Sequence, residues 1–397
     1  MPHPDIPPVL PHALTRGRHA RGAVLTRAAG GRRRVLVVGH CRSPIRPPFP
    51  GGLEALTWHL STRLAHRGHD VVVFAAPGSD CGPGTRIVTP DDLGMSVDPS
   101  APWEETRGDV TRAYEALAAH IDDLAVDVVH NHSLNPALPR VRHRLDVPVL
   151  TTLHTPPLVP MLGAFRQAPP APGEVVAVSD HTAQQWREAL HGDLLHPGVV
   201  HNGVDTEVWP LGPGGDALVW FGRLVPEKGP GTAIAMAREL GMPLRLVGPR
   251  SDPEWFDAQI RPQLGGAVEY LGHLGPPHLA EVVGTSAATL VTPQWDEPFG
   301  LIAAESAACG TPVIALRRGG LPEIVTPEVG RLLPPATWRS GVTGALEEVL
   351  GLERTDVRQS IVSRLGLDRM VDAYEGRYEQ LIRASGSRGG SLRAVGL

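Results

Sequence analysis

The sequence of 397 residues contains little lysine, few cysteines and no long apolar run. Of its 37 basic residues, only Lys228 is a lysine and the rest are arginines. The basic residues do not exceed the 42 acidic ones, and the formal net charge of −5 argues against a protein that coats nucleic acid. No stretch approaches the ~18 apolar residues of a membrane span. We therefore expect a soluble, cytoplasmic protein with no nucleic-acid partner and no transmembrane segment.

The three cysteines, Cys41, Cys81 and Cys309, lie far apart in the sequence. This spacing excludes a disulfide framework and a cysteine-rich zinc site, and the simplest interpretation is that all three are small packing residues. The excess of arginine, together with abundant alanine, glycine, proline and valine, is typical of a GC-rich bacterial genome. The single lysine, Lys228, is then present either by chance or because arginine cannot replace lysine at this position.

Residues 1–34 contain seven arginines and only one acid, Asp5. No apolar segment of useful length follows these charges, so the leader is not a secretory signal. Such an arginine-rich leader can resemble an organellar transit peptide. The GC-rich composition favours a disordered extension or a misassigned start codon instead.

From Arg34 onward, short apolar runs alternate with amphipathic stretches. The first run, at 34–39, predicts a strand buried on both faces, and Gly51 and Gly52 open a stretch with leucines at helical spacing. Further strands are expected at 70–74, 127–130, 147–153, 174–178, 199–200, 217–221, 244–247, 268–271, 288–291 and 312–315, with helices at 104–124, 180–190, 229–240, 253–263, 276–284 and 300–308.

This alternation predicts an α/β protein with parallel sheets covered by helices on both faces. It starts again after about Asp205, so we expect two doubly wound, Rossmann-like domains that face a central cleft. Ligands in such sheets bind beyond the carboxyl ends of the strands. The expected organisation is a disordered leader over 1–33, an N-terminal Rossmann-like domain over 34–205, a C-terminal Rossmann-like domain over 206–368, a helix over 369–386 that packs back on the N-terminal domain, and a disordered tail over 387–397.

The segment from Glu297 to Glu305 carries the strongest signal for a binding site. It follows an expected strand, and Pro298 and Gly300 suit the first turn of a helix, whose free N–H groups can bind an anion such as phosphate. Glu305 lies more than a turn inside that helix and could accept hydrogen bonds from ribose hydroxyls, while Glu297 could reach another part of the same ligand. A solvated acid favoured by the helix dipole is the alternative for Glu297. That alternative is weaker for Glu305, which lies in an alanine-rich stretch.

A second loop, from Gly222 to Gly229, follows the expected strand at 217–221 and contains Arg223 and Lys228. Two cations five residues apart in a strand-to-helix loop can converge on a diphosphate and stabilise it as a leaving group. Taken alone, an ordinary exposed basic loop explains them equally well. The acidic segment that follows makes the diphosphate interpretation the better one.

Several motifs are missing. The sequence contains no Gly-x-Ser-x-Gly, no Walker loop and no Asp-x-Asp metal clamp, and no Gly-x-Gly-x-x-Gly follows the first strand, which argues against a dinucleotide oxidoreductase. Ser179, Asp180 and His181 are sequence neighbours, whereas a hydrolytic triad is assembled from separate loops. We expect Arg223, Lys228 and helix N-termini to meet the charge of a diphosphate without an obligatory metal or other cofactor.

Arg223 and Lys228, followed about seventy residues later by Glu297 and Glu305, closely resemble the retaining glycosyltransferases of the GT-B fold, specifically family 4 (glycosyl transferases group 1). The resemblance covers some three-quarters of the chain, and its motifs occur in family order. The other matching segments are Gly51-Gly52, Val178-Ser179-Asp180, His201-Asn202-Gly203-Val204-Asp205, Val247-Gly248, Tyr270-Leu271-Gly272-His273-Leu274 and Gly310-Thr311-Pro312-Val313.

The resemblance implies that the domain over 34–205 binds the acceptor and that the domain over 206–368 binds the nucleotide sugar. It also implies a role for each matching position. Arg223 and Lys228 would hold the nucleotide diphosphate, Glu305 would bind the ribose, and Glu297 would contact hydroxyls of the donor sugar. A compact ammonium reaching one phosphate oxygen suits Lys228 better than a forked guanidinium would. The other implied nucleotide-sugar-binding residues are Gly51, Gly52, Gly222 and Gly248, then His273 and Leu274 near the base, and Phe299, Gly300 and Leu301 near the sugar and the distal phosphate.

Histidines follow two of the expected strands. His154 ends the strand at 147–153, where members of the resembled family commonly place a histidine near the donor sugar, and a histidine hydrogen-bonded at a strand end is the alternative. His130, Asn131 and His132 end another strand and could line the acceptor cleft. We set a metal site aside, because alternate strand residues are expected to point to opposite faces and no third ligand is evident.

The leading hypothesis is an enzyme that transfers a sugar from a nucleoside diphosphate to an acceptor with retention at the anomeric carbon. The resemblance implies same-face attack without a protein nucleophile, and a UDP-sugar is the expected donor, with GDP- and ADP-sugars as alternatives. A non-hydrolysing sugar-nucleotide epimerase and a non-catalytic sugar-nucleotide-binding homologue are the competing hypotheses. The acceptor stays open among lipids, glycans and small molecules.

Overall fold

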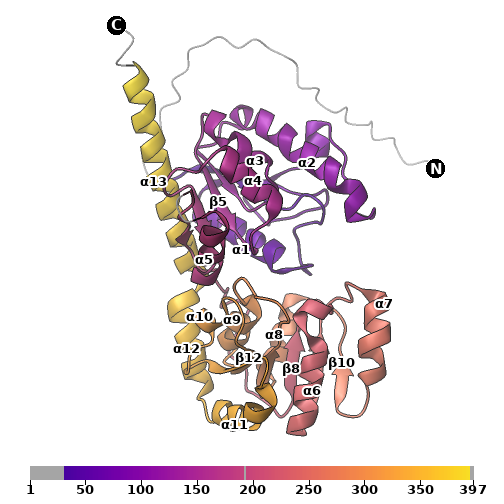
Figure 1. Cartoon of the computed structure of the whole chain (residues 1–397). Coiled ribbons are helices and arrows are strands. Elements are labelled where there is room, and N and C mark those ends of the chain that lie inside the picture. The colour runs from indigo at the N-terminus through magenta and orange to yellow at the C-terminus, as the bar shows by residue number, and fades with distance from the viewer. Residues whose placement is uncertain (1–30, 192–193, 394–397) are drawn as a thin grey trace, which may run out of the picture. The chain divides into compact units, whose positions relative to one another are not determined.

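The computed structural model describes residues 31–191 and 194–393 (Figure 1). The predicted leader, up to residue 30, and the last four residues of the predicted tail lie outside the described residues. Within the described part, no helix has both the length and the apolar character needed to cross a bilayer.

The first sheet is built from the N-terminal half of the chain. Its strands are β1 (Arg34–Val38), β2 (Asp70–Phe74), β3 (Thr85–Val88), β4 (Val128–Asn131), β5 (Val149–Leu153), β6 (Val175–Ala177) and β7 (Gly198–Val199). They pair in parallel in the order β3-β2-β1-β4-β5-β6-β7. The intervening helices are α1 (Gly52–His66), η1 (Asp91–Leu93), α2 (Trp103–His120), η2 (Asp122–Leu124), α3 (Ala137–Val141), η3 (Arg142–Arg144), α4 (Val159–Gln167) and α5 (Asp180–Ala189).

The second sheet repeats the pattern. Its strands are β8 (Leu218–Phe221), β9 (Leu244–Val247), β10 (Val268–Tyr270), β11 (Ala288–Val291), β12 (Val313–Leu316) and β13 (Gly330–Leu333), in the parallel order β10-β9-β8-β11-β12-β13. Its helices are η4 (Pro226–Lys228), α6 (Pro230–Leu240), α7 (Pro253–Trp255), η5 (Phe256–Ile260), η6 (Arg261–Gln263), α8 (Pro276–Gly284), α9 (Leu301–Ala308), α10 (Leu321–Ile324), α11 (Trp338–Leu350) and α12 (Arg354–Leu365).

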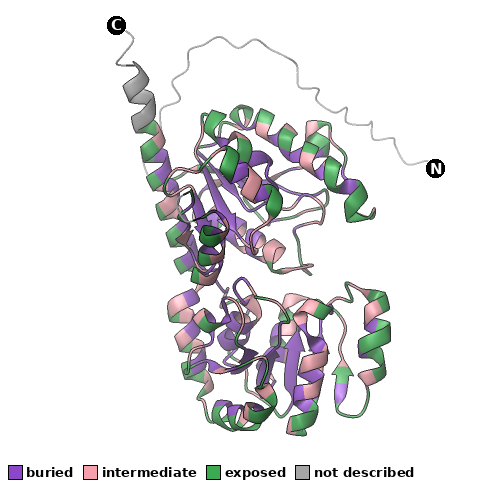
Figure 2. Ribbon diagram, viewed as in Figure 1, coloured by how far each residue is buried: buried purple, intermediate pink, exposed green. Residues whose placement is uncertain are grey.

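The cores follow from the apolar runs of the central strands. Strand β1 lies between β2 and β4, and its residues Val35–Val38 are fully buried, as predicted for a strand covered on both faces. Figure 2 shows buried residues along the strands and exposed residues mainly on the outer sides of the helices. The last helix, α13 (Leu367–Arg393), contributes Tyr374 and Tyr378 to the same core as Val35 and Val37 of β1. All three cysteines are buried and free, in agreement with their predicted role in packing.

Most predicted strands and helices are confirmed to within two residues, but some elements were missed. Strands β3 and β13 were not predicted, because both lie at sheet edges and carry exposed or half-exposed residues instead of a continuous apolar run. Helices α11 and α12 were also missed. Helix α13 continues to Arg393, into the range 387–397 predicted as the tail. A helix can run through the glycine and serine residues there because glycine in a helix interior costs only about 1 kcal/mol.

Candidate functional site

Lys228 lies beyond the carboxyl end of β8, in the turn that leads into α6. The next residue, Gly229, has a φ of +69° and is the N-cap of α6. A Cβ atom on Gly229 would lie 2.0 Å from the backbone oxygen of Thr292, so only glycine permits this close approach to the end of β11. Because β8 and β11 are neighbours in the sheet, the turn holds Lys228 beside the ends of both strands.

Lys228 and Glu297 form an ion pair. Nζ of Lys228 lies 2.7 Å from Oε2 of Glu297, and the two side chains are only 15% and 17% exposed. Nε1 of Trp295 donates a hydrogen bond to the same oxygen at 3.1 Å, and the Lys228 ammonium lies 5.2 Å from the centroid of the Trp295 ring. Oε1 of Glu297 has no hydrogen-bond partner among the described residues. Neither Lys228 nor Glu297 is therefore the freely solvated charge that the alternative interpretations required.

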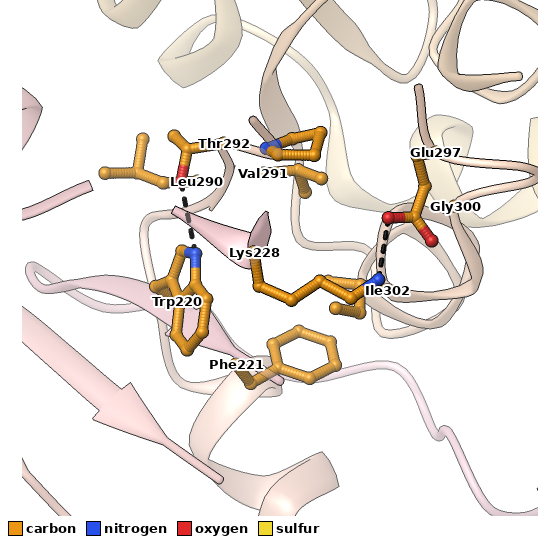
Figure 3. A pocket seen from close by; sticks show the side chains of 10 residues that line it. Trp220, Phe221, Lys228, Leu290, Val291, Thr292, Glu297, Gly300 and Ile302 are labelled. Carbon is orange, nitrogen blue, oxygen red and sulfur yellow. Dashed lines mark hydrogen bonds and ion pairs between the residues drawn. The ribbon is translucent and has the colours of Figure 1, made fainter. Parts of the chain in front are cut away.

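A pocket lies around this ion pair (Figure 3). Figure 3 shows the Lys228 side chain reaching across it toward the carboxylate of Glu297. On the apolar side, Nε1 of Trp220 donates to Oγ1 of Thr292 at 3.2 Å, which fixes the indole ring in the wall. The pocket is lined by Trp220, Phe221, Lys228, Leu290, Val291, Thr292, Pro293, Glu297, Gly300 and Ile302.

The N-terminus of α9 forms one end of the pocket. Its N-cap, Gly300, has a φ of +103°, and a Cβ atom there would lie 2.6 Å from Cδ2 of Leu321. The first N–H groups of a helix have no intrahelical acceptor, so the turn that starts at Leu301 can receive an anion. Gly52, at the start of α1, lies close by, since a Cβ atom on it would be 3.1 Å from Cδ1 of Leu301. The structure thus brings Gly52, Gly300 and Leu301 together.

Glu305 lies on the second turn of α9 and is half-buried. Burial raises the pKa of its carboxyl group to about 7, and no described residue donates a hydrogen bond to that carboxyl group. A carboxyl group that is partly removed from water and has no protein partner is suited to accept hydrogen bonds from a ligand. The carboxyl group therefore has the free hydrogen-bonding capacity that the predicted contact with a ribose requires.

The segment at 297–300 is held in place by its backbone carbonyl groups. The N–H of Gly320 donates to the carbonyl oxygen of Glu297 at 2.7 Å. The Pro298 carbonyl oxygen accepts hydrogen bonds from the hydroxyls of Ser179 at 2.5 Å and Thr182 at 3.1 Å, and both hydroxyl-bearing residues are fully buried. The start of α5 therefore supports the loop that carries Glu297.

Glu323 of α10 completes this support. Sequence analysis missed it, although the Gly319-Gly320-Leu321-Pro322 run before it marks a turn into a helix. Its carboxylate accepts hydrogen bonds from the backbone N–H groups of Asp180 and His181, each at 2.9 Å, and bonds Nε2 of His201 at 2.8 Å. Burial acts to raise the pKa of Glu323, but these hydrogen bonds outweigh it and lower the pKa. Ligand atoms of Asp180, His201 and Glu323 lie within 4.8 Å of one another, but both Glu323 oxygens are already satisfied by protein donors.

Other predicted site residues lie outside the pocket lining. Arg223 is 43% exposed and pairs with Glu227 at 3.6 Å, so it does not converge with Lys228 in this structure. Gly222 and Gly248 touch through their backbones, because a Cβ atom on Gly248 would lie 1.8 Å from the carbonyl oxygen of Gly222. His273 and Leu274 follow β10, the first exposed and the second half-buried. Phe299 is buried, and Leu301 is half-buried at the start of α9. Gly51 is the N-cap of α1.

Three histidines of the first sheet, His130, His132 and His154, form a cluster in which the first two are fully buried and the third is partly buried. His130 and His132 lie on the same face, with ring centroids 3.9 Å apart, so the expectation that they point to opposite faces was wrong. Residues two apart in a strand share a face, and only adjacent residues alternate. Nδ1 of His132 lies 2.9 Å from Nε2 of His154. His130, Asn131 and His132 are all fully buried, which is not the setting of residues that line an open acceptor cleft.

Two family models match the chain. The model described as Glycosyltransferase Family 4 matches residues 50–208, and the model described as Glycosyl transferases group 1 matches residues 207–359. The glycogen synthase of Mycobacterium tuberculosis is 31% identical over 348 residues, which cover 77% of this chain and 81% of that protein. The chain belongs to glycosyltransferase family 4.

Two further comparisons extend this assignment. A D-inositol 3-phosphate glycosyltransferase of Acidothermus cellulolyticus is 30% identical over 454 residues, covering 90% of this family 4 glycosyltransferase and all of the relative. The crystal structure of Anabaena HepE in complex with UDP-glucose superposes with a TM-score of 0.67 at 16% identity, over 89% of this chain and 100% of that one. At this identity the likeness concerns the fold alone, and it confirms the predicted GT-B architecture of two α/β domains.

Proposed function

We propose that this family 4 glycosyltransferase transfers a sugar from a UDP-sugar to an acceptor with retention of anomeric configuration. The observation that carries the proposal is the Lys228–Glu297 ion pair beside the N-terminus of α9. This arrangement offers a cation and free N–H groups for a diphosphate, and a carboxylate oxygen for a sugar hydroxyl, within one pocket. Cytoplasmic localisation belongs to the same proposal, because nucleotide sugars are the substrates.

In this proposal each charged residue meets one part of the donor. The Lys228 ammonium and the first N–H groups of α9 contact the diphosphate, and Arg223 turns from Glu227 to reach it. Oε1 of Glu297, which has no described partner, accepts a hydrogen bond from a donor-sugar hydroxyl. Glu305 accepts hydrogen bonds from the ribose, whose hydroxyls satisfy its half-buried carboxyl group.

The chemical step needs no protein nucleophile. The acceptor hydroxyl oxygen attacks the anomeric carbon on the face from which the phosphate leaves, so the new glycosidic bond forms as the bond between this carbon and the phosphate oxygen breaks. The hydroxyl proton passes to the departing diphosphate. Lys228 and the α9 N-terminus stabilise the negative charge that grows on the leaving group, and His154 orients the sugar.

The choice of uridine rests on the solved neighbour of the same fold that holds UDP-glucose. The named relatives, a glycogen synthase and an inositol-phosphate glycosyltransferase, differ in the acceptors that their names state, so the proposal commits to the donor and not to the acceptor.

A thermal-shift panel of UDP-, GDP- and ADP-sugars tests the donor directly. We expect the UDP-sugars to raise the Tm most, and Glu305→Gln to reduce that shift. Detection of free UDP with a panel of sugar acceptors then tests transfer, and the configuration of the product at the anomeric carbon tests retention. Interconversion of the donor without an acceptor would indicate an epimerase, and binding without any turnover would indicate a non-catalytic homologue.

A further inference from the structure

The histidine cluster of the first sheet contains a hydrogen bond between two imidazole rings. His132 follows β4, His154 follows β5, and Nδ1 of His132 lies 2.9 Å from Nε2 of His154. One of these two nitrogens must carry the hydrogen, and the other must accept it. The ring nitrogen that carries the proton in a neutral histidine is set by the hydrogen bond that its other nitrogen makes.

Both rings are neutral at physiological pH. Burial lowers the pKa of His154 to about 3. Burial also holds the pKa of His132 well below its ordinary value, and the neighbouring rings of His130 and His154 add to the effect. Each ring therefore carries a single proton, and the shared hydrogen bond decides the tautomer of both rings at once.

The other nitrogen of His132 indicates which ring donates. Nε2 of His132 is buried and has no hydrogen-bond partner in the part of the chain that the structure describes. If the proton were on Nε2, a buried N–H donor would be left unpaired, which folded proteins rarely tolerate. With the proton on Nδ1, His132 donates to His154 and only a lone pair is left without a partner. Nδ1–H is therefore the favoured tautomer of His132.

The ring of His132 is also held in its orientation. His130 lies against it with ring centroids 3.9 Å apart, and both nitrogens of His130 are engaged. Its Nδ1 bonds the Tyr378 hydroxyl at 2.6 Å, and its Nε2 bonds the Thr152 hydroxyl at 2.8 Å. Tyr378 belongs to α13, so the last helix supports the back of the cluster.

We propose that His132 is a positioning residue that fixes His154 as the Nδ1–H tautomer, so that His154 offers an N–H donor to an oxygen of the donor sugar. Nε2 of His154 accepts the hydrogen bond from His132, so the proton of His154 lies on Nδ1. His154 is only partly buried. Its Nδ1 is not a fully buried atom left without a partner, so this edge of the ring is open to a ligand. The inference rests on the proposed function, in which His154 contacts the sugar.

Nitrogen NMR of the protein labelled with ¹⁵N-histidine tests the tautomer without any turnover, and His154→Asn identifies the His154 signals. We expect His154 to show the Nδ1–H pattern in the wild-type protein. His132→Asn should keep that pattern, because the asparagine Nδ2–H group can stand in for the imidazole Nδ1–H group. His132→Leu removes the donor, and His154 should then shift toward the Nε2–H tautomer. An Nε2–H pattern for His154 in the wild-type protein would overturn the proposal.

Kinetics supply a second readout. We expect kcat/KM for the donor to fall at least tenfold in His132→Leu and to recover to within about threefold of wild type in His132→Asn, while the affinity for UDP, which carries no sugar, stays unchanged in both. Tyr378→Phe is the matched control, since it loosens the same cluster without touching His154 and should leave the His154 tautomer unchanged.

If His132→Leu does not fold, the wild-type and His132→Asn spectra still decide which tautomer His154 adopts. A wild-type protein that shows the Nδ1–H pattern but binds no sugar nucleotide would refute the proposed function and leave the tautomer assignment standing.

Discussion

The ammonium nitrogen of Lys228 lies 2.7 Å from Oε2 of Glu297, although 69 residues separate the two in the sequence. The turn before α6 presents one partner and the loop before α9 presents the other, so the ends of two neighbouring strands create the pair. The Glu297 carboxylate keeps the Lys228 side chain extended into the pocket before any ligand arrives. Such preorganisation lowers the reorganisation needed when charge develops on a leaving group.

Lys228→Ala and Glu297→Ala are each expected to lower the transfer rate by about 10²-fold or more, which is the size of effect seen when one stabilising group is removed from a site of developing charge. Lys228→Arg should also lose activity, because a forked guanidinium does not replace a compact ammonium. Steady-state kinetics measure the effect, and circular dichroism checks that each variant is folded. Arg339→Ala, which removes an exposed cation from α11, is the control and should transfer normally. Near-normal transfer by Lys228→Ala or Glu297→Ala would refute the proposed function.

Thr182→Val should raise the KM for the donor several-fold, because it removes a hydroxyl that holds the Pro298 carbonyl group next to Glu297. Loss of a buried hydrogen bond of this kind costs about 1 kcal/mol of unfolding free energy. Thr62→Val is a matched control, because the Thr62 hydroxyl donates to the carbonyl groups of Trp58 and Cys81, which do not belong to this loop. Both variants should lose similar stability in urea unfolding, but only Thr182→Val should change KM. An equal change in KM for both would mean that the Thr182 contact supports the fold without positioning the loop.

The parts of the site that depend on residues close together in the sequence were predicted better than the parts that depend on distant residues. The strand that ends at Phe221 and the helix that opens at Gly300 follow from apolar runs and turn residues, and both lie where expected. The hydrogen bonds of Glu323 to the start of α5 were not predictable, because they join segments more than 140 residues apart. The same is true of the Lys228–Glu297 contact, since spacing alone did not indicate that the two charges would meet. The error at His130 and His132 had a different origin, which was the wrong period for a strand.

Glu305 should make stability depend on pH. Its pKa is raised from an ordinary value of 4.5 to about 7, so between these pH values the folded state binds more protons than the unfolded state and stability falls as pH rises. Glu305→Gln removes the titrating carboxyl group and with it this loss of stability at higher pH. The unfolding free energy of the variant relative to wild type should therefore rise between pH 4.5 and pH 8 by an amount on the order of 2 kcal/mol. Urea unfolding at both pH values measures this difference in unfolding free energy. If the difference does not change with pH, the pKa of Glu305 is not raised in the folded state.

Arg67 connects α1 to α13 through several carboxylates. Its guanidinium contacts Asp368 at 2.8 Å, Asp372 at 2.6 Å and Glu375 at 2.7 Å, while its own side chain is 23% exposed. Single exposed ion pairs contribute about 0.2–1 kcal/mol, but one half-buried cation with three acidic partners should contribute more.

Arg67→Met should therefore lower the unfolding free energy by about 1–2 kcal/mol at low salt, and by less at ~1 M NaCl, where the Debye length is only ~3 Å. Arg112→Met is the control, because Arg112 is 63% exposed and pairs with Asp109, one turn away on α2. Urea unfolding of both variants at low and high salt makes the comparison. If Arg67→Met lowers the unfolding free energy no more than Arg112→Met does, the packing of α13 depends on its apolar residues alone. The Tyr374 and Tyr378 side chains in the core of the first sheet would then carry it.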